Sequence, residues 1–349
     1  MVDQHYHMHR EIHEQPLVIR TVAEKGEYSA RALAQAIRDR GIQFAMISAR
    51  GTSDNAALYT KYRFEIEAGI PVASAAPSIF TLYGGQLNLS RALVLGISQS
   101  GKAQDVVEVV SAARAAGALT AAITNDPSSE LAQVAEHVLL CHAGEERSVA
   151  ATKTYTATLA NVALLVDALV GRPRVGEDLE QAAQGMEQVL AMEESIELLT
   201  ERYRYMTACM VLSRGYNFCT AQEAALKMME TGYVIARAYS AADFLHGPIA
   251  VVDTGFPCFI YAPNGSAYAT MLQLTAKLRE RGAEIVVVSC NPEILRLATR
   301  MIALPYDVAE RISPLVYIVV GQLFAFHLSE TRGYDPDRPR GLSKITITR

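Results

Sequence analysis

Short, unbroken hydrophobic runs rich in β-branched residues recur along the chain, and longer segments with helix-like spacing separate them. A continuous apolar run of this length is typical of a strand buried on both faces of a parallel sheet. Strands that alternate with helices indicate βαβ units. The runs are residues 44–48, 92–97, 120–124, 209–212, 258–261 and 285–289. The pattern therefore predicts an α/β fold built on parallel sheets.

The two longest apolar stretches, residues 156–170 and 315–326, are shorter than the roughly 18 residues typical of a membrane span. Polar residues also interrupt them, namely Asn161, Asp167 and Gln322. We expect buried helices here and no membrane association.

Features of the first half recur in the second half at an offset of about 164 residues. This offset is far longer than a solenoid repeat, so it favours a duplicated domain over a chance echo of α/β features. The paired segments are 48–51 with 213–215, 98–101 with 262–265, and 115–117 with 280–282. Arg172-Pro173-Arg174 breaks the helical pattern between the halves. The expected segments are an arm 1–24, a first domain 25–171, a linker 172–195, a second domain 196–334 and a tail 335–349.

Composition narrows the class of protein. Half of the 349 residues are hydrophobic, enough for two ordinary cores, and the net charge of −5 argues against a nucleic-acid partner. The five cysteines are scattered without a CxxC pair, which is typical of free thiols in a reducing compartment. Residues 1–16 are polar and histidine-rich, unlike a signal peptide. We expect a cytoplasmic protein.

The segment Ser98-Gln99-Ser100-Gly101 directly follows the apolar run 93–97 and precedes a helix-like segment 103–116. A helix N-terminus presents free N–H groups and a positive dipole end, and the two serines add hydroxyl donors. This arrangement predicts a phosphate site. Gly51-Thr52-Ser53 would form a similar turn at a neighbouring strand, and the two turns could converge on one ligand. The alternative is that these hydroxyl residues only cap helices.

Glu223, Lys227 and Glu230 are spaced i, i+4 and i+7, which places them on one face of a helix. From spacing alone, the trio is either a solvated ladder of salt bridges or a catalytic cluster. A carboxylate can move a proton between adjacent carbons if burial raises its pKa.

These motifs, with several others in the same order, resemble one family over nearly the whole chain. The others are Glu11-Ile12, Glu14-Gln15-Pro16, Val149-Ala150, Thr152-Lys153, His246-Gly247-Pro248, Asp337, Pro339-Arg340, Leu342 and Lys344. The chain resembles the isomerase half of glutamine:fructose-6-phosphate aminotransferase, which is built from two sugar isomerase (SIS) domains. The resemblance implies two flavodoxin-like, doubly wound parallel sheets with flanking helices.

The resemblance also implies how substrate is bound. Ser98, Gln99 and Ser100, with Ser53 alongside, would bind the phosphate. Thr52 and the backbone near Val149 would contact sugar hydroxyls. Ala103 stands where the family has a threonine, so one hydroxyl donor is missing. In the tail, Ser343 replaces the family's alanine and is expected beside the substrate.

Catalytic roles follow from the same resemblance. Glu230 would be the base, Lys227 would assist the substrate oxygen, and Glu223 would orient Lys227. His246 would open the sugar ring and would come from a partner subunit, which implies a homodimer. Lys344 would form a Schiff base with the open-chain ketose, which acidifies the neighbouring C–H bond.

The family's glutamine-using domain begins with a cysteine nucleophile, whereas Val2 follows Met1 here. We therefore expect deamination of an amino-sugar phosphate, with glucosamine 6-phosphate giving fructose 6-phosphate and ammonia. Galactosamine 6-phosphate and a fructosamine phosphate, the substrate of a deglycase, are further candidates. Alternatives are synthesis of glucosamine 6-phosphate with free ammonia or a separate glutaminase, and a non-catalytic sugar-phosphate sensor. Sensors of this kind usually add a helix-turn-helix domain, for which no spare basic segment exists.

Four histidines near the start, His5, His7, His9 and His13, raise the question of a metal site. Their alternate spacing on a terminal segment argues against one, and the predicted chemistry needs no metal. We expect neither a metal nor a cofactor.

Overall fold

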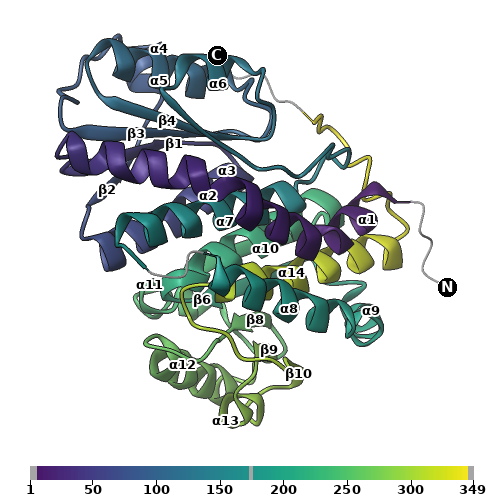
Figure 1. Cartoon of the computed structure of the whole chain (residues 1–349). Helices are drawn as coiled ribbons and strands as arrows, with labels where there is room; N and C mark the ends of the chain where they lie inside the picture. The colour runs from purple at the N-terminus through teal and green to yellow at the C-terminus, as the bar shows by residue number, and fades with distance from the viewer. Residues whose placement is uncertain (1–5, 173–175, 345–349) are drawn as a thin grey trace. The chain divides into compact units, whose positions relative to one another are not determined.

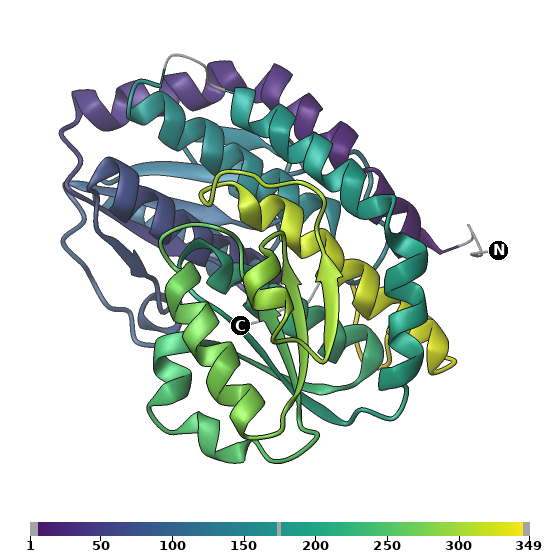
Figure 2. The same ribbon diagram turned by 90° about the horizontal axis from the view of Figure 1, so that it is seen from below.

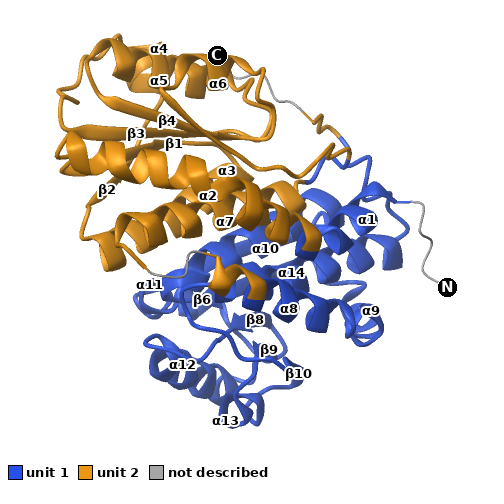
Figure 3. Ribbon diagram, in the orientation of Figure 1, with its two compact units in different colours: residues 1–16, 148–150, 181–340 blue, residues 17–147, 151–180, 341–349 orange. Residues whose placement is uncertain are grey.

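The computed structural model describes residues 6–172 and 176–344. Contacts divide the chain into two units, coloured separately in Figure 3. Each unit contains one five-stranded parallel sheet. Unit 1 comprises residues 1–16, 148–150 and 181–340, and unit 2 comprises residues 17–147, 151–180 and 341–349.

The sheet of unit 2 has the strand order β2-β1-β3-β4-β5. Its strands are β1 (Phe44–Ser48), β2 (Val72–Ser74), β3 (Ala92–Ile97), β4 (Leu119–Thr124) and β5 (His137–Leu140). Helices cover both faces, with α4, α5 and α6 on one and α2, α3 and α7 on the other (Figure 1). These helices are α2 (Gln15–Asp39), α3 (Thr52–Arg63), α4 (Ser78–Thr81), α5 (Gln104–Ala115), α6 (Glu130–Val134) and α7 (Lys153–Leu169).

The sheet of unit 1 repeats this order as β10-β9-β8-β6-β7. Its strands are β6 (Ala208–Ser213), β7 (Ile235–Ser240), β8 (Pro257–Tyr261), β9 (Glu284–Ser289) and β10 (Arg300–Ala303). Helices again lie on both sides (Figures 1 and 2). The helices of this unit are α1 (His7–His13), α8 (Glu177–Leu190, whose residues 177–180 belong to unit 2), α9 (Glu193–Thr200), α10 (Phe218–Gly232), α11 (Ala241–Leu245), α12 (Tyr268–Glu280), α13 (Pro292–Leu295) and α14 (Ser313–Thr331). The prediction of two doubly wound domains is confirmed.

Each unit contains one hydrophobic helix that is buried along almost its whole length. The two long apolar stretches lie in α7 and α14, and α14 is buried from Ser313 to Ser329. A helix that is apolar on all sides is stable only when other parts of the protein surround it. No helix in the described ranges is long and apolar enough to span a membrane. Gly321 lets α14 pack closely on α10, because a Cβ atom there would lie 2.8 Å from the Ala224 Cβ.

The expected boundaries of the arm, the two domains, the linker and the tail stay predictions. The expected end of the arm at residue 24 falls inside α2, and the expected linker 172–195 contains α8. Pro173 and Arg174, on which the linker prediction rests in part, lie outside the described residues.

Candidate functional site

The turn Ser98-Gln99-Ser100-Gly101 connects β3 to α5 in a tightly specified conformation. Gly101 has a φ of +61°, in the left-handed region, and its N–H donates to the Ser98 carbonyl at 3.1 Å. A Cβ atom at Gly101 would lie 2.1 Å from the Ser129 Oγ, so only glycine fits. The turn is therefore held rigidly at the end of its strand.

Backbone donors of this turn are available to a ligand. The Ser98 N–H is used by the Ile123 carbonyl. Within residues 6–172 and 176–344, no acceptor pairs with the N–H of Gln99 or Ser100. At the start of α5, the N–H groups of Gln104 and Asp105 add to them, since neither has an acceptor in the same described ranges, whereas that of Val106 is used by the Ala103 carbonyl. Together these donors suit an anion such as phosphate.

A second turn lies beside the first at the carboxyl edge of the sheet. β1 pairs with β3, with Ser48 opposite Gly96, and Gly51 leads directly into α3. The Arg50 Nε donates to the Asp105 carboxylate at 2.6 Å, which ties this turn to the first turn of α5. The strand order reverses between β1 and β3, which is where open α/β sheets bind ligands. The structure thus brings Thr52 and Ser53 to the same edge as the Ser98 turn.

The alternative that these hydroxyl residues are helix caps is wrong. The N-cap residue of α3 is Gly51 and that of α5 is Ala103, and neither helix has a side-chain cap. Ser98 and Ser100 precede the cap position of α5, and Thr52 and Ser53 follow that of α3. Their hydroxyl groups are therefore not committed to capping.

Replacing Ala103 with threonine is expected to raise the free energy of unfolding by about 1 kcal/mol, because Thr caps a helix and Ala does not. Ala103 already has the extended conformation of an N-cap residue, with φ −70° and ψ 103°. If phosphate binds at this turn, the added hydroxyl should also lower KM for a sugar phosphate. Urea unfolding and steady-state kinetics measure the two effects. Ala103→Val has the same shape without the hydroxyl, and equal behaviour of the two variants would contradict the prediction.

The trio on α10 is a buried charged cluster. The Lys227 Nζ lies 3.3 Å from the Glu223 carboxylate and 2.5 Å from the Glu230 carboxylate. The side chains of Glu223 and Lys227 are fully buried, whereas that of Glu230 is 23% exposed. Burial by itself lowers the pKa of Lys227, but the two carboxylates raise it above its ordinary value. The solvated-ladder interpretation is therefore wrong, and Glu230 is the member that a ligand can reach.

The tail lysine is also paired. The Lys344 Nζ donates to the Glu146 carboxylate at 2.8 Å. Glu146 accepts three more hydrogen bonds, from the N–H groups of Thr152 and Thr154 and from the Thr154 hydroxyl. Burial alone raises the pKa of Glu146, but Lys344 and these N–H groups lower it further than burial raises it. Lys344 is thus held by a buried carboxylate instead of being solvated.

Sequence reasoning missed Glu146. The charged stretch Glu145-Glu146-Arg147 has the composition of an exposed loop, and Glu145 and Arg147 are indeed exposed. One feature of the sequence could have identified Glu146, namely its position shortly before α7. A carboxylate there can accept hydrogen bonds from the free N–H groups at the start of the helix.

Replacing Glu146 with glutamine is expected to lower the free energy of unfolding at pH 7 by about 1–3 kcal/mol, since Lys344 and the N–H groups lose their charged acceptor. Because the pKa of Glu146 is lowered in the folded protein, its contribution is present above the unfolded pKa of about 4.3. That contribution is lost as the pH falls through the folded pKa. The difference between native and variant should therefore shrink in acid, which urea unfolding across pH values measures. Glu145→Gln serves as the exposed control, and a pH-independent difference would contradict the prediction.

The other expected site residues lie as follows. His246 is exposed at the end of α11, and in the described part of the chain its side chain has no hydrogen bond or ion pair with the α10 trio. Val149 is half-buried, and Ser343 is exposed next to Lys344.

Several residues of the matching motifs hold unit 1 together. The Asp337 carboxylate accepts the N–H groups of His7 and Met8 at the start of α1. Glu11 accepts the Ser148 N–H at 3.2 Å, and the Gln15 side chain donates to Gln322. These residues act as structural ties.

In unit 1, residues 262–265 form the turn that corresponds to the phosphate turn of unit 2. A carboxylate of the protein itself occupies the anion position at this turn. Glu310 accepts the N–H groups of Ser266 at 2.7 Å and of Ala267 at 3.3 Å. A Cβ atom at Gly265 would lie 2.3 Å from this carboxylate. The anion position after β8 is therefore occupied, and the corresponding position after β3 in unit 2 is not filled in this way.

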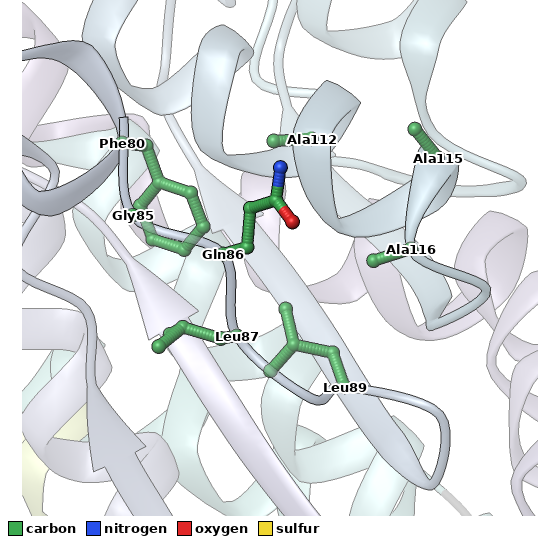
Figure 4. A pocket seen from close by; sticks show the side chains of 8 residues that line it. All are labelled: Phe80, Gly85, Gln86, Leu87, Leu89, Ala112, Ala115 and Ala116. Atoms are coloured by element: carbon green, nitrogen blue, oxygen red, sulfur yellow. The ribbon is translucent and has the colours of Figure 1, made fainter. Parts of the chain in front are cut away.

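A pocket of about 420 Å³ in unit 2 lies away from both turns. Figure 4 shows Phe80 and Gln86 on one side and the end of α5 on the other. Its lining residues are Phe80, Gly85, Gln86, Leu87, Leu89, Ala112, Ala115 and Ala116. It contains none of the expected site residues.

Comparison with known proteins supports the resemblance. A glutamine–fructose-6-phosphate aminotransferase (isomerizing) from Methanothermobacter thermautotrophicus is 37% identical over 343 residues, which covers 97% of this chain and 57% of the relative. The chain thus spans somewhat over half of the length of the curated relatives that it matches. A second such relative, from Thermococcus kodakarensis, is 33% identical over 353 residues, which covers 97% of this chain and 58% of that protein.

Solved structures match in fold. A candidate phosphosugar isomerase from Silicibacter pomeroyi DSS-3 is 33% identical with a TM-score of 0.83, covering 95% of this chain and 100% of that one. The SIS domain model matches residues 44–168 and 208–331, one match on each sheet. The chain therefore belongs to the SIS domain family, with two copies of the domain and homologues among phosphosugar isomerases.

Proposed function

We propose that the protein is a phosphosugar isomerase that deaminates an amino-sugar phosphate, converting glucosamine 6-phosphate and water into fructose 6-phosphate and ammonia. The observation that carries this proposal is the buried trio Glu223, Lys227 and Glu230, in which only Glu230 is accessible. A carboxylate next to a buried ammonium suits proton transfer at a carbon beside a carbonyl group.

The Ser98 turn and the Gly51 turn would bind the phosphate. Ser98, Gln99 and Ser100, with Ser53, supply hydroxyl, amide and backbone N–H donors, and α5 adds the positive end of its dipole. Thr52, Val149 and Ser343 would contact the rest of the sugar. Binding through the phosphate fixes the sugar without involving its reacting carbons.

Glu230 would act as the base. With the sugar in its open-chain form, Glu230 removes the C2 proton, and the electron pair of that bond forms a C1=C2 double bond while charge develops on the C1 oxygen. The buried Lys227 ammonium would stabilise this charge electrostatically, from behind Glu230 and without direct contact, and Glu223 holds the lysine in place. Glu230 then returns the proton to C1, the nitrogen loses one proton while the C1 oxygen gains one, and the product is an imine at C2 next to a C1 hydroxyl group.

Lys344 would remove the nitrogen. After its ammonium loses a proton to solvent, the amine adds to the C2 imine and expels ammonia. Water then adds to the resulting imine and frees the lysine and the ketose. The net change is addition of one water and loss of one ammonia. His246, expected from the partner of a homodimer, would transfer the protons that open the sugar ring.

The same residues would serve the reverse reaction, and the relatives named glutamine–fructose-6-phosphate aminotransferase favour synthesis as the second candidate. Synthesis requires a source of ammonia, whereas deamination requires only water. For this reason we place deamination first.

A substrate panel tests the assignment. Purified protein is given glucosamine 6-phosphate, galactosamine 6-phosphate, a fructosamine phosphate, or fructose 6-phosphate with ammonium, and every product is followed by NMR. Ammonia from the first substrate supports the proposal. Turnover of another member would reassign the substrate, and binding of all members without turnover would indicate a sensor.

A further inference from the structure

A cluster of histidines and carboxylates lies in unit 1, apart from the α10 trio. His9 and His13 are on α1, and Glu193 begins α9. The His9 Nε2 lies 2.8 Å from the Glu193 Oε1, and the His13 Nε2 lies 2.8 Å from the Glu193 Oε2. One ligand atom from each residue falls within 4.8 Å of the other two. None of these three residues has a role in the proposed reaction.

The spacing of the two histidines explains why they converge. They are four residues apart on a helix, so their rings point from the same face, and the ring centroids are 4.6 Å apart. His9 is largely buried, whereas 39% of the His13 side chain is exposed. The pair thus forms a chelate that opens to solvent on one side.

We propose that His9, His13 and Glu193 bind a divalent transition metal ion of the zinc class. Two imidazole nitrogens and one carboxylate oxygen are a ligand set that zinc accepts, with a water molecule as the fourth ligand. Zinc bonds of about 2.0–2.1 Å place tetrahedral ligand atoms about 3.3 Å apart. Each histidine nitrogen lies 2.8 Å from a different oxygen of Glu193, so the separation to the one ligating oxygen would widen by about 0.5 Å. The remaining ligand-atom separations, which are within 4.8 Å, would adjust to about 3.3 Å through side-chain rotation.

A third histidine positions the carboxylate. The His327 Nε2, from α14, lies 2.8 Å from the Glu193 Oε1 on the buried side of the cluster. The His327 Nδ1 lies 3.2 Å from the Glu330 carboxylate, and the His327 side chain is only 1% exposed. Residues that hold a metal ligand in orientation in this way usually strengthen metal binding.

The ion would be structural. It would join α1 to α9, and α1 carries Glu11, whose carboxylate accepts the Ser148 N–H. Folded protein binds the ion through residues far apart in sequence, so binding stabilises the fold by mass action. Without an ion, the same side chains form hydrogen bonds to Glu193, and the experiment must distinguish the two cases.

The test is equilibrium dialysis of the full chain, stripped of metal with a chelator, against micromolar Zn²⁺. We expect about one zinc ion per chain and a rise in Tm of several degrees, since a ligand at 100 times its Kd stabilises by about 2.7 kcal/mol. His13→Gln should weaken binding by at least about 10-fold and abolish the rise in Tm. Co²⁺ in place of Zn²⁺ should give the visible absorption of a four-coordinate site in the native protein alone.

His7→Gln is the matched control, because His7 lies on the same helix and contacts Arg10 instead of Glu193. Glu193→Gln is a second variant, which keeps a hydrogen-bond acceptor but removes the charged ligand. Failure of the native chain to retain zinc would overturn the proposal and leave a hydrogen-bonded cluster only. Equal zinc binding by native protein, His13→Gln and Glu193→Gln would overturn it as well. All these measurements are independent of catalytic activity.

Discussion

Replacing Glu230 with glutamine is expected to lower kcat by about 10³-fold or more, since general base catalysis contributes about 10²–10⁴-fold and no other described carboxylate of the trio is accessible. The amide is nearly the same size but cannot accept the C2 proton. The fold should persist, because Lys227 keeps its ion pair with Glu223. Exchange of the substrate's C2 hydrogen in D₂O, followed by NMR, reports this step directly.

Met229→Gln is the matched control, since Met229 is the exposed neighbour of Glu230 on α10 and lies outside the trio. It should exchange hydrogen at the native rate. Hydrogen exchange that survives Glu230→Gln would mean that another group is the base, even if overall turnover were reduced.

Replacing Lys344 with methionine is expected to reduce turnover by a similar factor, because the C2 imine loses its amine nucleophile. Borohydride reduction in the presence of fructose 6-phosphate should attach the sugar covalently to the native chain, and peptide mass spectrometry should locate it at Lys344. Lys344→Arg can keep a charged partner for Glu146 but cannot form the imine. It should therefore be inactive and close to native in stability.

The exposed Lys277 provides the control for trapping, since Lys277→Met leaves the tail unchanged. This variant should be labelled like the native protein. If Lys344→Met were labelled as strongly as the native protein, the trapped sugar would be attached to another residue. The proposed imine at Lys344 would then be contradicted.

Strand prediction succeeded where strands are buried on both faces. All six predicted strands are confirmed, and they are β1, β3, β4, β6, β8 and β9, the interior strands of the two sheets. The four that the pattern missed are β2, β5, β7 and β10, which are the edge strands. Edge strands are partly exposed and carry polar residues, as in β10, where only Ile302 is buried. Such segments lack the continuous apolar run on which the prediction depended.

The phosphate turn was predictable because its elements are consecutive in sequence: a strand, a hydroxyl-rich turn and a helix. The sequence could not decide whether the hydroxyl groups cap helices, since these residues lie only one to five positions from the N-cap residues. The structure settles this through the N-cap positions of Gly51 and Ala103. The echo of the turn in the second half was recognised, but Glu310, which fills it, lies more than 40 residues further along the chain.

Pairings between distant residues could not be predicted. Glu146 and Lys344 are separated by 198 residues, and neither has a local pattern that points to the other. Alternate spacing treats the four N-terminal histidines as one set, whereas of those that the structure describes only His9 and His13 reach Glu193, and His5 lies outside the described residues. Helical periodicity, rather than alternation, is the pattern that would have separated this pair from the others.

The most direct test of the central claim is the release of ammonia and fructose 6-phosphate from glucosamine 6-phosphate by the purified protein. We predict equal amounts of both products, formed at a rate that Glu230→Gln and Lys344→Met each reduce by about 10³-fold. Absence of ammonia release from native protein that binds the sugar phosphate would contradict the proposed deamination.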